Sequence, residues 1–155
     1  MLLTSHVAVG SAVGLATGNP VLGFFAAIIS HFLCDFTPHV DSPRDDIKLE
    51  NILEHKGTAA FLYFDIFISI LVFFIMLLKT NYAITVMWGT FGGILPDMID
   101  SVPFWSHKIR KYPFVKQLHF VHDNWHFTAR GKLRSLGWAT QIVFIVASFA
   151  YVFTR

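Results

Sequence analysis

The chain has 155 residues, of which 54% are hydrophobic and only 14% charged, and its mean hydropathy is +0.55. Seventeen Phe and four Trp with so few charged residues exclude an ordinary soluble domain, because its polar residues could not cover such an apolar core. The net charge of +2, without a basic stripe, excludes nucleic acid as the partner. We therefore expect a single integral membrane domain over residues 1–155.

Five apolar segments follow one another along the chain, at residues 7–16, 21–33, 58–78, 82–95 and 136–153. A transmembrane helix needs about 20 apolar residues, so the shorter segments predict helices that end within the membrane interface. Gly18-Asn19-Pro20 is a turn signal, and the first two segments therefore predict a helical hairpin. The fourth helix is expected to end at Pro96. The predicted fold is an all-α polytopic membrane helical bundle of four to five transmembrane or half-spanning helices.

Two polar loops, 36–57 and 100–134, separate these segments. The aromatic residues of the second loop suit the membrane–water interface, so part of this loop is expected to be an interfacial helical segment. If each segment crosses once, both loops share one face with the N-terminus and hold all basic residues except Lys79 and Arg155. The positive-inside rule then predicts a multi-pass protein of the cell inner (cytoplasmic) membrane, with its polar loops in the cytoplasm.

The same topology gathers the ionisable residues on one face. All eight histidines lie on or near it, as do all acidic residues except Asp65, which lies about two turns inside the third segment. Exclusion of polar residues from lipid explains part of this clustering. A shared metal site would explain the histidines as well.

His31 and Asp35 close the second apolar segment. Residues four apart lie on one helix face, where an imidazole and a carboxylate can bind one metal ion or bridge two. A simple hydrogen bond between them is the alternative. His39 and Asp41 extend this cluster, either as further ligands or as solvated loop residues.

Asp97 and Asp100 follow Pro96 at the end of the fourth segment. Two carboxylates at this spacing suit a bridging or base role beside a metal ion, which would cancel their repulsion. The alternative is a capped helix end, with Asp100 as the N-cap of the next segment.

His119, His122 and His126 have spacings of three, four and seven, which predict one face of a helix and a shared metal ion. The absence of a Glu between them excludes a zincin protease. The alternative is an interfacial helix whose histidines face headgroups. His6 and His55 each precede an apolar segment, as a ligand or as a solvated residue.

The chain resembles the bacterial membrane-bound metal-dependent hydrolases of the inner membrane, whose motifs lie at helix ends. The similar elements are Thr4-Ser5-His6, Ser30-His31 with Asp35, His55-Lys56-Gly57-Thr58, and Leu95-Pro96-Asp97 with Asp100. Two of these elements stand in swapped order, and the last has one extra residue between its carboxylates. The His-x-x-x-Asp pattern also resembles zinc-dependent phospholipase C at the level of motif. These resemblances imply metal-dependent hydrolysis and phosphoester chemistry.

The leading hypothesis is an enzyme in which one to three divalent ions activate water and polarise an ester. The expected ligands are His6, His31, Asp35, His55, Asp97, His119 and His122. Imidazole and carboxylate ligands together favour zinc, with manganese or iron as alternatives. Asp100 or Asp65 is the expected proton acceptor.

The expected substrate is a membrane lipid with a phosphoester headgroup, held by Lys108, Arg110 and Lys111. The rival is a metal-ion transporter or a membrane metal-binding protein without hydrolytic activity, with Asp65 on the ion path. An ion path should show polar groups through the membrane, whereas only this one acid lies at depth. A structural scaffold is a third hypothesis, against which the histidine density argues.

Overall fold

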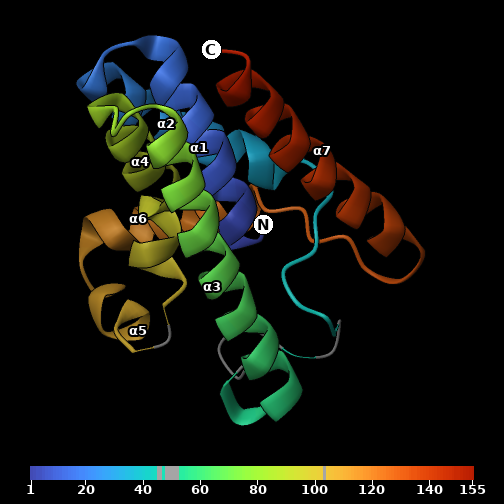
Figure 1. Cartoon of the computed structure of the whole chain (residues 1–155). Helices are drawn as coiled ribbons and strands as arrows, with labels where there is room; N and C mark the ends of the chain where they lie inside the picture. Colours follow the sequence, from blue (N-terminus) through green and yellow to red (C-terminus); the bar gives the residue numbers. More distant parts are fainter. Residues whose placement is uncertain (45–46, 48–52, 103) are drawn as a thin grey trace.

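The computed structural model describes residues 1–44, 47, 53–102 and 104–155. Its elements are α1 (Leu3–Thr17), α2 (Pro20–Phe36), α3 (Lys56–Lys79), α4 (Ile84–Asp100), α5 (Ser106–Ile109), α6 (Pro113–Asn124), the 3-10 turn η2 (Gly131–Leu133) and α7 (Arg134–Phe153) (Figure 1). The described residues contain no strand, only an isolated bridge between His39 and Thr128. The all-α prediction is confirmed, and each of the five apolar segments corresponds to its own helix.

The turn between α1 and α2 is built from the three residues that the sequence marks as a turn. Gly18 has a φ of 62°, a left-handed conformation that favours glycine and ends α1. The Asn19 side chain accepts hydrogen bonds from the backbone N–H groups of Val21 and Leu22, and Pro20 fills the first helical position. The first two helices are therefore an antiparallel hairpin, as predicted.

The prediction that the fourth helix ends at Pro96 is wrong, because α4 continues to Asp100. Proline removes one backbone donor but does not prevent helical geometry when the next turn is held by other bonds. Here the Ser101 N–H donates to the Asp97 carbonyl at 2.8 Å, and the Arg110 guanidinium donates to the Asp100 carbonyl at 2.8 Å. The extra turn brings both carboxylates to the end of the bundle.

Helix α1 is the central helix, in contact with α2, α3, α4 and α7. Its backbone touches that of α4, since a Cβ atom on Gly89 would overlap the Gly10 carbonyl and the Gly14 backbone. Helix α4 approaches α2 in the same way, because a Cβ on Gly92 would overlap the Phe24 carbonyl. Close approach through small residues is typical of membrane helices. It brings the ends of three helices together.

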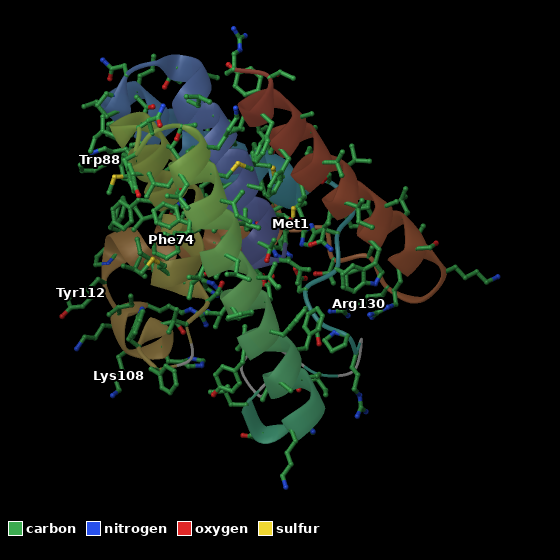
Figure 2. The ribbon with its side chains drawn as sticks, in the orientation of Figure 1. Met1, Phe74, Trp88, Lys108, Tyr112 and Arg130 are labelled. Carbon is green, nitrogen blue, oxygen red and sulfur yellow. The ribbon has the colours of Figure 1, made fainter. Side chains whose placement is uncertain are left out.

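The outer surface of the bundle is apolar. Val21, Phe25 and Ile29 on α2 are more than half exposed, and so are Phe64 and Phe67 on α3. Figure 2 shows Trp88 at the outer edge, with Lys108 and Tyr112 at the α5–α6 end. Two helical stretches, Lys56–Lys79 and Gly131–Phe153, are long and apolar enough to cross a membrane. The polar groups gather inside instead, at the end of the bundle where α1 begins.

Candidate metal centre

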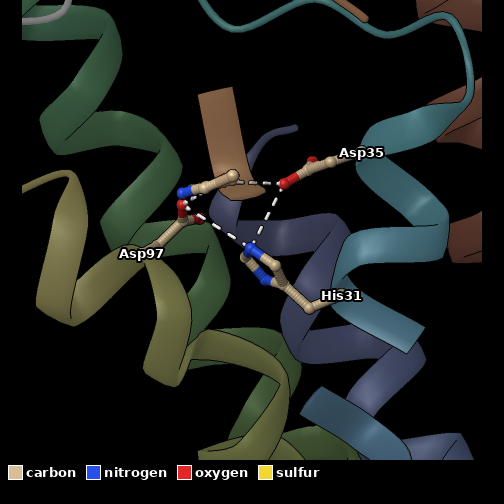
Figure 3. A group of neighbouring side chains, drawn as sticks. His31, Asp35 and Asp97 are labelled. Atoms are coloured by element: carbon tan, nitrogen blue, oxygen red, sulfur yellow. Dashed lines mark hydrogen bonds and ion pairs between the residues drawn. The ribbon is translucent and has the colours of Figure 1, made fainter. Parts of the chain in front are cut away.

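Four potential ligands converge where α2, α4 and α6 meet: His31 and Asp35 from α2, Asp97 from α4, and His122 from α6. Figure 3 shows the first three pointing toward a common centre. The Nε2 atoms of His31 and His122 lie 3.2 and 3.1 Å from Asp35 Oδ2, and 3.8 and 3.6 Å from Asp97 Oδ1. Tetrahedral zinc with ligands at about 2.0–2.1 Å separates them by about 3.3 Å. The four atoms therefore fit one ion.

The Nδ1 hydrogen bonds of both imidazoles turn Nε2 toward this centre, where His122 Nε2 contacts Asp35 Oδ2 at 3.1 Å. His31 Nδ1 lies 2.7 Å from the Gly93 carbonyl, which can only accept, so Nδ1 carries the proton. The buried Nε2 atom of His31 has no hydrogen-bond partner in the described structure. His122 Nδ1 donates to Asp100 Oδ2 at 3.2 Å. A backbone carbonyl and a carboxylate are the groups that usually orient metal-binding histidines.

Asp100 lies outside the four ligands and holds His122 in place. It also accepts from Arg110 Nε at 3.0 Å and lies 3.0 Å from His119 Nδ1. Burial alone would lower the pKa of His122, but the hydrogen bonds to Asp100 and Asp35 raise this pKa to about 10. Without a metal ion the carboxylates therefore retain a proton on His122. His119, expected as a ligand, reaches Asp100 rather than the centre, and Arg110, expected at a headgroup, does the same.

His6 lies against the other side of the same carboxylates. Its ring stacks on that of His31 at 4.0 Å between centroids. Its Nε2 atom lies 3.2 Å from Asp35 Oδ1 and 3.8 Å from Asp97 Oδ2, and neither ring nitrogen has a hydrogen-bond partner among the described residues. Buried polar atoms without partners are rare in native proteins, and a bound ion or substrate is one explanation.

Other predicted site residues lie elsewhere. His55 is exposed at the start of α3. Asp65 accepts from the backbone N–H groups of Leu3 and Thr4 at 2.8 and 3.2 Å and from the Thr4 hydroxyl at 2.6 Å, and so caps α1 from another helix. Lys108 and Lys111 are exposed near α5.

Three further residues lie near the centre: His39 and Asp41, which the sequence left open between ligands and solvated loop residues, and His126, which it grouped with His119 and His122 but which lies nearer His39. His39 is buried because its N–H donates to the Phe127 carbonyl and its carbonyl accepts from the Ala129 N–H, which ties the two loops together. His126 lies beyond the end of α6, so the expected helix over all three histidines is too long by two residues. The helical spacing of the three histidines indicated a metal-binding role for His126, but it could not show that His126 would pair with His39 instead of His122.

Comparison with protein-family models, with curated proteins and with solved structures gives no significant match to this chain. The function is therefore inferred from the geometry of the centre.

Proposed function

We propose that the chain is a multi-pass protein of the inner membrane and a metal-dependent hydrolase, acting on a phosphoester of a lipid at the cytoplasmic face. The observation that supports it most is the set of two imidazoles and two carboxylates with ion-sized spacing, of which all but the half-buried Asp97 are buried. The Nδ1 hydrogen bond of His31 adds to this, because it turns Nε2 toward two carboxylates, an arrangement that a bound cation would stabilise. The set suits a divalent ion, and mixed nitrogen and oxygen ligands favour zinc.

The distribution of side chains supports the membrane part of the proposal. Large apolar side chains are exposed on α2, α3, α4 and α7, whereas His, Asp, Ser, Thr and Gln side chains are buried among the helices. Water would penalise this arrangement and lipid would favour it. α1, α2 and α4 have 15, 17 and 17 residues. At 1.5 Å per residue they extend about 22–26 Å, close to the hydrocarbon thickness of about 30 Å.

When bound, a divalent ion would lower the pKa of water toward about 7 and polarise the phosphoryl group. The chain's own residues would bind the ion and orient its ligands. Asp100 keeps the proton of His122 on Nδ1, and Arg110 keeps Asp100 in place. His6 is the remaining imidazole beside both carboxylates, and in this proposal it accepts the proton from water. Asp100 and Asp65 suit that role less, since other donors already occupy their oxygens.

Two features support a lipid as the substrate. The exposed Lys108 and Lys111 lie on the segment that also contributes Arg110 to the site, and can attract an anionic headgroup. An open groove of about 280 Å³ between α1, α3 and α4 has apolar walls, and it is lined by Leu3, Val7, Ile66, Ser69, Ile70, Phe73, Met87, Thr90, Phe91 and Ile94. Ile94 lies one helical turn before Asp97, so an acyl chain here would bring its headgroup close to the centre.

Elemental analysis and lipid hydrolysis by the detergent-purified full chain test the proposal together. We expect at least one bound divalent ion and release of phosphate or a phosphorylated headgroup from phosphatidic acid or phosphatidylcholine in mixed micelles. His31→Ala and His122→Ala should lose both the ion and the activity. His55→Ala is the matched control, because this histidine is exposed and apart from the centre. A metal-free protein, or full activity of His31→Ala, would overturn the proposal.

The same experiment separates the proposal from its rival, a metal transporter or metal-binding protein. Asp65, the acid inside the third apolar segment, caps the start of α1 and is not available to an ion path without breaking those bonds. Bound metal that depends on His31, without hydrolysis of any lipid phosphoester, would favour the rival.

A further inference from the structure

We infer that a second divalent cation binds beside the first. Its ligands are His39, Asp41, His126 and the Oδ1 atom of Asp35. His39 Nε2 lies 2.9 Å from Asp41 Oδ1, 3.3 Å from His126 Nε2 and 3.9 Å from Asp35 Oδ1. His126 Nε2 lies 3.7 Å from Asp41 Oδ1. These separations again match a tetrahedral ion, for which about 3.3 Å is expected.

The tautomers of the two imidazoles follow from their partners. His39 Nδ1 lies 2.8 Å from the Thr37 carbonyl and must donate to it, which leaves a lone pair on Nε2. The Thr128 hydroxyl has one proton, and it donates this proton to Asp41 Oδ2 at 2.5 Å. The hydroxyl oxygen therefore accepts from His126 Nδ1 at 3.2 Å, and His126 Nε2 also has a lone pair.

In the neutral imidazoles two Nε2 lone pairs face each other at 3.3 Å, beside Asp41 Oδ1, whose neighbours are His39 Nε2 at 2.9 Å and the Met1 ammonium at 3.0 Å. Two imidazole nitrogens and a carboxylate oxygen directed at one point are the ligands that a divalent cation prefers. Such a cation would satisfy all three atoms at once. Among the described residues, the Met1 ammonium lies against this group, 2.7 Å from Asp35 Oδ1 and 3.0 Å from Asp41 Oδ1. A positive charge therefore already stabilises the two carboxylates, and the proposed ion would share or take over these oxygens from the ammonium.

Asp35 joins the two sites. Its Oδ2 atom faces His31 and His122, and its Oδ1 atom faces the second group. A carboxylate shared in this way holds two ions a few ångström apart, as in two-metal hydrolases that clamp a phosphoryl group, where the ions lie about 3.5–4 Å apart. The second ion thus deepens the proposed function and rests on it through Asp35. It specifies a phosphoryl group, whose oxygens can contact both ions, as the part of the substrate that binds here.

Manganese titration of the full-length protein in detergent tests the inference, with Mn²⁺ as the probe after removal of bound metal. We expect two ions per chain by elemental analysis and an exchange-coupled pair in the electron paramagnetic resonance spectrum. His126→Gln and His39→Gln should each reduce the count to one and abolish the coupling. His107→Gln is the matched control, because His107 is exposed. Circular dichroism and gel filtration of each variant verify that it is folded.

The outcomes separate this inference from the proposed function. A single ion that is lost in His31→Ala but retained in His126→Gln would overturn the second site and leave the proposed hydrolase intact. A protein that binds no Mn²⁺ or Zn²⁺ would overturn both. An uncoupled spectrum at two ions per chain would also overturn the inference, because ions on a shared carboxylate must interact.

Discussion

Asp35 is the side chain around which the centre is organised. It is 1% exposed, and its two oxygens contact imidazoles from α1, α2 and α6 as well as the Met1 ammonium. A buried carboxylate is costly unless positive charge or donors surround it. The helix spacing of His31 and Asp35 made this pair recognisable from sequence. The loop residues His39 and His126 were not recognisable as a pair, because backbone pairing between two distant loops brings them together.

Replacing Asp100 by Asn should weaken metal binding without removing a ligand. The Asn side chain retains the shape but loses the charge that orients His122 and its Nδ1 proton. Loss of such an orienting partner typically reduces metal affinity by about 10–100-fold. Competition with a chromogenic zinc chelator measures this change, and Asp123→Asn, an exposed position on the same helix as His122, is the control. An unchanged affinity in Asp100→Asn would show that His122 does not bind the ion through Nε2.

Metal binding should release a proton from His122 at neutral pH. The pKa of this imidazole is raised to about 10 in the metal-free protein, so it is protonated below that pH, whereas an ion needs its lone pair. Affinity should therefore rise with pH up to about 10, by up to about tenfold per unit for one proton. Titration calorimetry in two buffers with different ionisation enthalpies measures the release. Equal heats in both buffers would contradict the prediction.

At the scale of the elements, glycines set how closely the helices approach and hence where the ligands meet. Gly10 and Gly89 place α1 directly on α4, and Gly93 offers its carbonyl to His31. All five apolar helices were predictable from hydropathy, because each segment is flanked by turn or polar residues. The continuation of α4 beyond Pro96 was not predictable, because the turn after the proline is stabilised by a hydrogen bond from Arg110, which lies later in the chain.

Replacing Gly89 by Ala should push α1 and α4 apart and weaken metal binding. The added methyl group meets the Gly10 carbonyl and the Gly14 backbone, neither of which can move without shifting a helix. Overpacking of this kind typically costs about 1–3 kcal/mol. Thermal unfolding in detergent and zinc affinity are the measurements. Gly57→Ala is the matched control, because a Cβ there meets nothing within 4 Å. Equal unfolding temperatures of the two variants would contradict close packing of these helices.

At the scale of the whole molecule, the bundle places polar groups inside and apolar groups outside. The candidate ligands lie at the end where α1 begins and where α2 and α4 finish, so alternating helices deliver them to one side. The gathering of these ligands at one end was predictable from the sequence, because hydropathy alone shows which ends of successive helices share a side. Hydropathy does not show how far along the bundle axis each residue lies. His55 precedes α3 by one residue yet lies apart from the centre, because Asp65, nine residues into α3, is the residue level with the start of α1.

The orientation of the bundle in a membrane gives the last prediction. In the topology expected from the sequence, all basic residues except Lys79 and Arg155 share one face with the metal ligands, so the positive-inside rule predicts that the centre lies on the cytoplasmic side. In a Cys34→Ala background, Asp123→Cys should react with an impermeant thiol reagent in inside-out vesicles only, and Asn81→Cys in right-side-out vesicles only. Both native positions are exposed, whereas Cys34 is buried. Labelling of both from the same side would contradict a bundle in which α3 crosses the membrane between these two ends.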